Sequence, residues 1–233
     1  MYTHIDLQEW NLSSRISYDE IYQYLSSNRH VANYIRTLDI TIVHYRIDDS
    51  SQWYNQVPSI LQMLPSSLER ISLSSLLHID GTGDTSRIIL VAWSDLPATF
   101  RKAFLDCLWS PNIIEASMER IGGFPLSIFN PCTQLKRLSL LQVECTPTTS
   151  DAQFPPQIDS LVLSRSEDLA TIISWAKTSH GLRSVNFESD NEADHEVGYG
   201  QLAGLLDSCS DTLIKLELDL RLLCRFAFYA RKL

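Results

Sequence analysis

A pattern of apolar residues, L-x-x-L-x-L with other apolar residues allowed, recurs seven times along the chain. From the third copy on, successive copies start 22, 23, 24 and 31 residues apart, and the first two intervals are longer. One match to so short a pattern means little, but seven in order are hard to produce by chance. Such a repeat constrains the whole fold, so it is considered before any single element. The copies begin at Ile35, Leu68, Ile113, Leu135, Ile158, Leu182 and Leu213.

Each copy fits a short strand whose last two apolar residues point to the same side, because successive side chains of a strand alternate between faces. One such unit cannot bury its own apolar face, so neighbouring units must stack into a continuous core. The period is close to the roughly 20 to 29 residues of a leucine-rich repeat. We therefore expect an α/β fold, a leucine-rich-repeat solenoid or horseshoe with parallel strands on the concave face and helices or irregular segments on the convex face. An ordinary layered α/β domain is the alternative.

Segments between the copies have apolar residues at the spacings of three and four that are typical of amphipathic helices. The first follows a capping-box pattern, Ser17-Tyr18-Asp19-Glu20. In the second, Pro58 predicts a helix start near that residue. Residues 1–233 are expected to form one degenerate domain of about seven repeats, incomplete at one or both ends. The expected helices cover residues 21–25, 53–64, 98–109, 169–176 and 202–209.

The repeat lacks the Asn or Cys that usually follows the second apolar position by five residues. An asparagine ladder therefore cannot satisfy the polar backbone groups of the turns, and apolar packing must fill several of these positions. The positions hold Val43, Leu76, Ile121, Val143, Ser166, Asp190 and Arg221.

Composition excludes several classes of function. The formal net charge of −9 argues against general affinity for nucleic acid or for an anionic membrane surface, since both need a basic footprint. The N-terminus has neither a basic nor an apolar signal region, and no apolar run approaches the length of a membrane span. The five cysteines include no C-x-x-C pair, which indicates reduced thiols that act as small apolar filler. We expect an intracellular protein, cytoplasmic or nuclear.

Four parts of the chain share their sequence character with a known family. They are Leu25–Asn28 with Tyr34–Leu38, Trp93–Pro97 with Phe100–Phe104, Gly122–Phe129, and Leu205–Leu213. Through these segments the chain, over about residues 17–220, resembles the leucine-rich-repeat region of fungal F-box/leucine-rich-repeat-type proteins. The resemblance implies the substrate-recognition part of an F-box-type ubiquitin-ligase receptor.

The chain departs from that family at both ends. No F-box of the family's usual length precedes the first repeat, so a Skp1-type adaptor is an expected partner only if an F-box exists outside this chain. Residues 222–233, LLCRFAFYARKL, include the apolar Phe226, Phe228 and Tyr229 and have no polar capping helix. A non-functional truncated gene fragment is therefore an alternative interpretation.

The sequence contains few residue patterns that are typical of a catalytic site. It contains no G-x-S-x-G motif and no Ser, His and Asp set at a recognisable spacing, so a hydrolase on a layered α/β fold is the less favoured reading. The Gly-rich run 80–86 lacks the G-K-[ST] of a phosphate loop. The acidic stretch 188–196 fails the EF-hand pattern. We expect no enzyme activity, no catalytic residue, no cofactor and no metal.

The expected function is protein–protein interaction through the concave face. Residues that flank the inward apolar pair of each strand would point to this face, and they are mostly small and hydroxylated. Arg70 and Arg137 are the candidate anchors, because arginine is enriched at interface hot spots. The partner is an unknown protein. The candidate partner-binding residues are Arg70, Ser72, Glu115, Ser117, Arg137, Ser139, Ser184, Asn186, Lys215 and Glu217.

Overall fold

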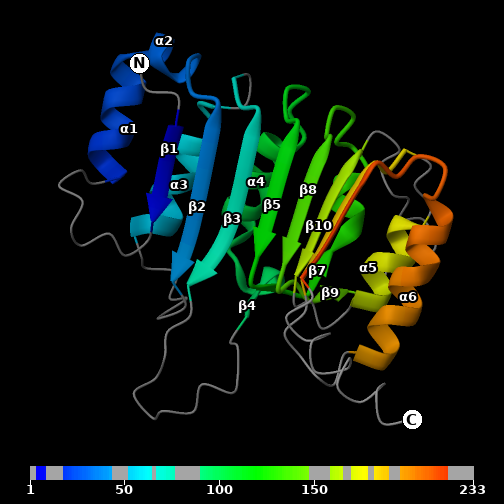
Figure 1. Ribbon diagram of the computed structural model, residues 1–233. Coiled ribbons are helices and arrows are strands. Elements are labelled where there is room, and N and C mark those ends of the chain that lie inside the picture. Colours follow the sequence, from blue (N-terminus) through cyan, green and yellow to red (C-terminus); the bar gives the residue numbers. More distant parts are fainter. Residues whose placement is uncertain are drawn as a thin grey trace, which may run out of the picture.

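Eight parallel strands form one sheet in which the spatial order of the strands is their order in the sequence (Figure 1). The computed structural model describes residues 4–8, 18–43, 52–64, 67–76, 90–146, 158–164, 169–177, 181–188 and 195–219. Each strand pairs with the next one along the sheet, so each connection returns the chain to the same edge and adds one strand. The strands are β1 (His4–Gln8), β2 (Thr37–Val43), β3 (Arg70–Leu76), β5 (Glu115–Glu119), β8 (Arg137–Leu141), β10 (Ser160–Ser164), β11 (Ser184–Glu188) and β12 (Lys215–Asp219).

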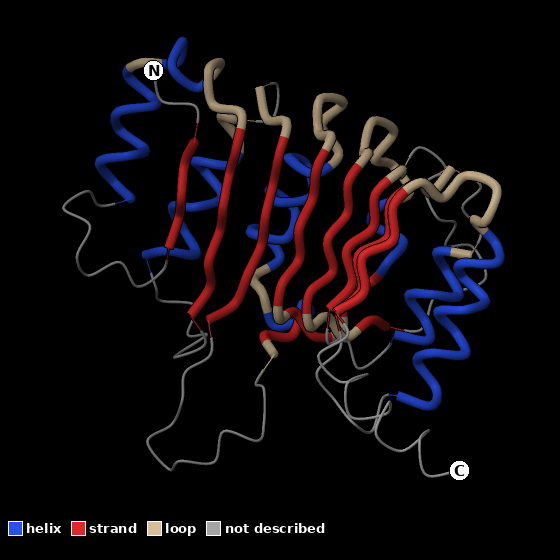
Figure 2. Tube along the Cα trace, viewed as in Figure 1, coloured by secondary structure: helices blue, strands red, loops and turns tan. Residues whose placement is uncertain are grey.

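The helices lie on one face of this sheet, and the opposite face carries no helix or strand of the described residues (Figures 1 and 2). Neighbouring helices pack against one another: α1 against α3, α3 against α4, and α5 against α6. The α/β class expected from the sequence is therefore confirmed. The helices are α1 (Tyr18–Ser27), α2 (Arg29–Ala32), α3 (Gln52–Leu61), α4 (Ala98–Leu108), α5 (Leu169–Ala176) and α6 (His195–Ser208), with short 3-10 turns at Trp93–Asp95 and Leu126–Phe129.

The register places the seven motifs in line across the sheet. We number the rows of aligned residues from the first residue of each strand, so row 1 runs from His4 on β1 to Lys215 on β12. Rows 2 and 4 face the helices and are apolar. Between β2 and β11 every member of these two rows is at most 6% exposed. Row 2 holds Leu38, Ile71, Ala116, Leu138, Leu161 and Val185, and row 4 holds Ile40, Leu73, Met118, Leu140, Leu163 and Phe187.

Three details differ from the sequence expectations. Strand β1 precedes the first motif and was missed, because five residues without the repeat spacing give little signal. Pro58 lies inside α3 rather than at its start. The helix continues through it because Val57, Ile60 and Leu61 bury their side chains completely, which offsets the lost backbone hydrogen bond. Helix α6 begins seven residues before the expected Leu202.

Two short strand pairs and a cluster of aromatic rings lie in the connections between the central strands of the sheet. Strand β4 (Val91–Ala92) pairs with β6 (Ile121–Gly122), and β7 (Phe124–Pro125) pairs with β9 (Cys145–Thr146). The ring of Phe124 lies 5.2 Å from that of Trp93 and 5.7 Å from that of Phe129. Phe129 continues the chain of rings to Trp175 on α5 at 6.0 Å. Aromatic contacts therefore join segments from three connections, those between β3 and β5, β5 and β8, and β10 and β11.

Polar side chains bridge the turns at the carboxyl ends of the central strands. Arg120 and Gln142 follow β5 and β8 with positive φ angles of 58° and 55°. The Arg120 Nε donates to Gln142 Oε1 at 2.8 Å, and the Ser75 hydroxyl donates to the Arg120 carbonyl at 2.7 Å. The neighbouring ladder positions Ile121 and Val143 are fully buried. Apolar packing fills these two positions, as expected, and the side chains of Ser75, Arg120 and Gln142 form hydrogen bonds beside them.

We predict that Phe124→Ala lowers the free energy of unfolding by about 3 to 5 kcal/mol, because the fully buried ring leaves a cavity between Trp93 and Phe129. Urea denaturation followed by circular dichroism measures the change. Tyr24→Ala is the control, since this ring is half-exposed on α1, and its expected loss is below about 1 kcal/mol. Equal losses from both variants would contradict the prediction.

We predict that Arg120→Ala lowers the free energy of unfolding by about 1 to 3 kcal/mol, because it removes the hydrogen bonds that the guanidinium donates to Gln142 Oε1 and to the Ser75 carbonyl. Arg120→Gly loses the same bonds but adopts positive φ without strain, so it should be about 1 kcal/mol more stable than the alanine variant. The same denaturation measurement separates the two contributions. If the two variants are equally stable, the backbone at residue 120 is not strained.

Candidate partner-binding face

The open face of the sheet, defined here as rows 1, 3 and 5, collects the candidate residues that the sequence singled out. All ten lie in rows 1 and 3, and all have intermediate or exposed side chains while their neighbours in rows 2 and 4 are apolar. Row 1 holds Arg70, Glu115, Arg137, Ser184 and Lys215. Row 3 holds Ser72, Ser117, Ser139, Asn186 and Glu217.

The two candidate anchors share one carboxylate. Glu115 lies between Arg70 and Arg137 in row 1, and its Oε2 is 3.3 Å from Arg70 Nε and 3.0 Å from Arg137 Nη1. The side chains of Arg70 and Arg137 are still 51% and 54% exposed. The cluster carries two positive charges and one negative charge, so it keeps a net positive charge at the surface. Exposed ion pairs of this kind contribute little to stability, but they fix the two guanidinium groups in place.

A second cluster lies at the edge of the sheet near β1. His4 Nε2 is 2.7 Å from Asp39 Oδ2, and the Ser72 hydroxyl donates to Asp39 Oδ1 at 2.5 Å. The carboxylate is therefore the central member of the three. In a hydrolytic triad the histidine would stand between the serine and the acid, so that it could accept the proton of the nucleophile. This arrangement orients side chains and does not activate the Ser72 hydroxyl.

Charge is divided along the strands of the open face. We define the basic rim as the exposed or partly exposed cations in row 1 or one residue before it. Three acidic residues lie at the same positions as the rim: Glu69, Glu115 and Asp159. Rows 3 and 5 contain no Lys or Arg. The acidic residues described in these two rows are Asp39, Glu119, Glu188 and Glu217. The basic rim consists of Arg36, Arg70, Lys136, Arg137, Arg183 and Lys215.

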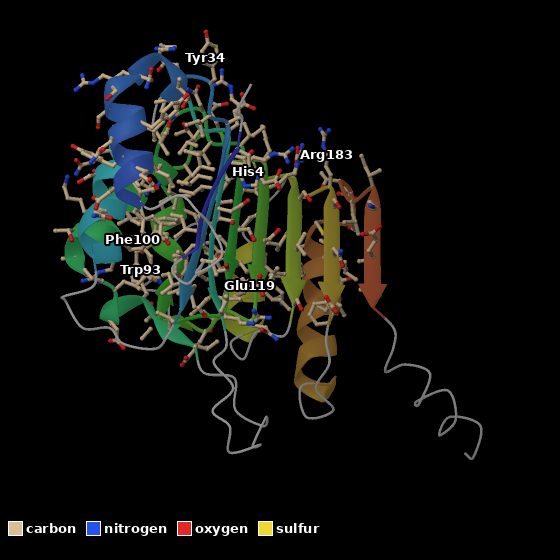
Figure 3. The ribbon with its side chains drawn as sticks, turned by 90° about the vertical axis from the view of Figure 1, so that its left-hand side faces the viewer. His4, Tyr34, Trp93, Phe100, Glu119 and Arg183 are labelled. Carbon is tan, nitrogen blue, oxygen red and sulfur yellow. The ribbon has the colours of Figure 1, made fainter. Side chains whose placement is uncertain are left out.

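Figure 3 shows this division at two labelled residues, because Arg183 and Glu119 lie near opposite ends of the strands. Among the described residues, Lys136 and Arg183 have no ion-pair partner, so their charges face solvent. Arg120 follows row 5 directly, but its guanidinium is held by Glu119 Oε1 at 2.9 Å. The open face thus has a positive band at the start of the strands and a negative region toward their ends, in a protein of net charge −9.

Two cavities lie outside the open face. One, of about 570 Å³, opens beside the basic rim and is lined by the ion pair Arg36–Glu69 (3.2 Å) together with Ser67, Asn112 and Gln134. Arg36 also donates to the Ser67 carbonyl at 2.9 Å, which ties two connections together. The other, of about 330 Å³, lies on α4 between Trp93 and Trp109. The linings of both cavities lack a nucleophile paired with a base among their described residues.

The described cysteines do not provide a reactive thiol. Cys107, Cys132, Cys145 and Cys209 are buried and form no disulfide, in agreement with their interpretation as apolar filler. Burial, together with a smaller effect of the charge of Asp106, raises the pKa of Cys107 to about 12, and burial raises the pKa of Cys132 to about 12. Thiolates are the nucleophilic form of cysteine, so these two groups are poor nucleophiles at neutral pH.

The described part of the chain contains neither a metal-binding cluster nor a helix that could cross a membrane. Within the described ranges, no group of three or more His, Cys, Asp or Glu side chains is arranged to hold a metal ion. None of the helices there combines the length and the hydropathy that a membrane crossing needs. The Gly-rich run 80–86, most of the acidic stretch 188–196, the last cysteine Cys224, and Phe226, Phe228 and Tyr229 lie outside the described residues.

Of the basic rim, the sequence analysis predicted Arg70, Arg137 and Lys215 but missed Arg36, Lys136 and Arg183, and it missed the His4–Asp39–Ser72 cluster. The three missed rim residues occupy the first variable position of L-x-x-L-x-L, which directly follows the first apolar residue. In the other four copies this position holds two acidic residues and two isoleucines, so the sequence signal is weak. His4 had no such signal, because β1 carries no copy of the motif.

Comparison with known proteins does not assign a function to the open face. No protein-family model matches the chain, and no curated protein is similar enough to it to count as a match. The function of the open face is therefore inferred from its own side chains.

We predict that iodoacetamide at pH 8 alkylates Cys107 and Cys132 at least about 100-fold more slowly in the native protein than after denaturation, because burial keeps both thiols protonated and inaccessible. Peptide mass spectrometry over time measures each rate. Folding raises both pKa values, so this contribution to stability is complete below about pH 9 and is lost as pH rises toward 12. Rapid native labelling of either cysteine would contradict the prediction.

Proposed function

We propose that the chain is a leucine-rich-repeat-type αβ solenoid that binds a protein partner on its open face and catalyses no reaction. The fold part of the proposal is supported by seven motifs that form seven consecutive parallel strands in register, with a described helix or short 3-10 turn in each of their connections except that between β8 and β10. In such an architecture the sheet face away from the helices is the usual extended binding surface.

The observation that carries the binding proposal is the divided charge of the open face. Complementary charge steers encounter and excludes wrong partners, which is the main contribution of surface charge to recognition. The Arg70–Glu115–Arg137 cluster keeps a net positive charge and half-exposed guanidinium groups, so an acidic side chain of a partner can pair with it. Rows 3 and 5 would favour basic groups of the same partner. The two regions together favour a partner of mixed charge, bound in one direction along the strands.

The resemblance to fungal F-box/leucine-rich-repeat-type proteins extends the proposal to a biological role. The chain would be the substrate-recognition region of an F-box-type ubiquitin-ligase receptor, or a remnant of one, and it would act in the cytoplasm or nucleus. A Skp1-type adaptor would join it only through an F-box outside this chain. This role is supported by the sequence segments that resemble the family and not by the charges of the open face.

We predict that the wild-type chain, immobilised and exposed to a fungal lysate, enriches a specific protein that the variant Arg70→Glu/Arg137→Glu enriches at least about tenfold less, because the variant reverses two exposed charges of the basic rim. Quantitative mass spectrometry measures the enrichment. The matched control is Lys102→Glu/Lys177→Glu, which makes the same change of charge on exposed residues of the helix layer.

The control variant should capture the partner as well as the wild type does. Retention of the partner by the rim variant, or an equal loss from both variants, would contradict binding on the open face. If wild type and variants alike enrich only chaperones, the truncated-fragment interpretation becomes the better one.

A further inference from the structure

We infer that the helix layer carries a second protein-binding site, which accepts an aromatic side chain and an adjacent acidic side chain of a partner protein. The site is the cavity of about 330 Å³ on α4, lined by residues of this helix, by Trp109 at its end and by Trp93 in the 3-10 turn before it. Figure 3 labels Trp93 in the helix layer, apart from Glu119 on the sheet, so this site is separate from the open face.

Trp109 provides a fixed aromatic ring at the surface. Its side chain is 41% exposed, and its Nε1 donates a hydrogen bond to the Ile128 carbonyl at 2.7 Å. The hydrogen bond satisfies the single polar atom of the ring and holds the ring in place, so the exposed part of the side chain is apolar and preorganised. Tryptophan is enriched among the residues that dominate binding energy at protein interfaces. An aromatic side chain of a partner can pack against this ring edge-to-face or offset-stacked.

Arg101 supplies a positive charge that the described residues do not neutralise. Its guanidinium forms no ion pair with them, and its Nε is buried without a hydrogen-bond partner. A buried donor without an acceptor is unfavourable, so a ligand that brings an acceptor relieves this cost. A carboxylate is the most suitable acceptor, because it can take two parallel hydrogen bonds from a guanidinium group.

The other two charges of the lining offset each other. Lys102 Nζ lies 3.3 Å from Asp106 Oδ2, one turn further along α4. The ammonium group thereby reduces the repulsion between Asp106 and an incoming carboxylate, and Arg101 remains the charge without a partner among the described lining residues. Arg101, Leu105 and Trp109 follow one another at intervals of four residues, which places them on the same side of the helix. The cationic and the apolar parts of the site are therefore neighbours.

The size of the cavity favours a short segment over a folded surface. Ligand pockets range from about 300 to about 1,000 Å³, and the volume of about 330 Å³ is near the lower end of this range. Such a cavity has room for one large side chain together with the charged group of an adjacent residue. A partner segment with an aromatic residue next to an acidic one satisfies both requirements at once.

The test titrates the isotope-labelled full chain with the peptide acetyl-Gly-Phe-Glu-Gly-amide, up to about 5 mM. Nuclear magnetic resonance follows the indole N–H signals of the five tryptophans, and Trp109→Phe identifies the signal of Trp109. This signal should shift and saturate. The matched peptide acetyl-Gly-Phe-Gln-Gly-amide should bind at least about fivefold more weakly, because it lacks the carboxylate. Arg101→Gln should weaken binding of the acidic peptide about fivefold or more and leave binding of the neutral peptide within about twofold.

Arg183→Gln is the matched control, since it removes the same charge from an exposed arginine at the edge of the sheet. It should leave the dissociation constants of both peptides unchanged, as should the rim variant Arg70→Glu/Arg137→Glu. An acidic peptide that does not shift the Trp109 signal overturns the inference. So does equal binding of the two peptides, or an equal effect of Arg101→Gln on both, because the cavity is then an apolar patch without a carboxylate site. Weaker binding to the rim variant would place the peptide on the open face instead.

Discussion

Apolar contact between equivalent side chains of neighbouring strands holds the structure together. In row 2, Leu38, Ile71, Ala116 and Leu138 stand beside one another at the same height in successive strands, and none is more than 2% exposed. A shift of one residue in any pair would turn apolar side chains toward the open face and polar ones toward the helices, so the register is strongly specified. The polar rows, the basic rim and the position of each helix all depend on this alignment.

The same alignment determines how charged residues are distributed over the open face. Because every strand starts at the same edge, any bias at one motif position becomes a band across the sheet. Lys136 and Arg183 come from connections about 47 residues apart in sequence, yet they occupy the same edge of strands that are separated only by β10. A surface assembled in this way can change one position at a time without disturbing the apolar rows beneath it.

Much of this arrangement follows from the sequence. The motif located seven strands, and alternation within each strand assigned the ten candidate residues to one face. The pairing of Arg70 and Arg137 through Glu115 was not foreseen, since it depends on which strands are neighbours across intervals of 45 and 22 residues. The persistence of α3 through Pro58 also escaped prediction, because tertiary burial of Val57 and Ile60 outweighs the local preference. The hydrogen bonds of Arg120 depend on its positive φ angle, and the residue type makes such an angle predictable only for glycine.

Because each strand pairs with its neighbours in the sequence, the sheet can fold and unfold one strand at a time. No strand has to wait for a distant part of the chain, because the partner of each is the next strand to be synthesised. The closure entropy of each step therefore stays small for a parallel sheet. Opening is graded in the same way: among the described residues, the end strands β1 and β12 pair with one neighbour each, whereas β5 and β8 pair with two. Amide exchange would begin at the two ends of the sheet and reach its centre last.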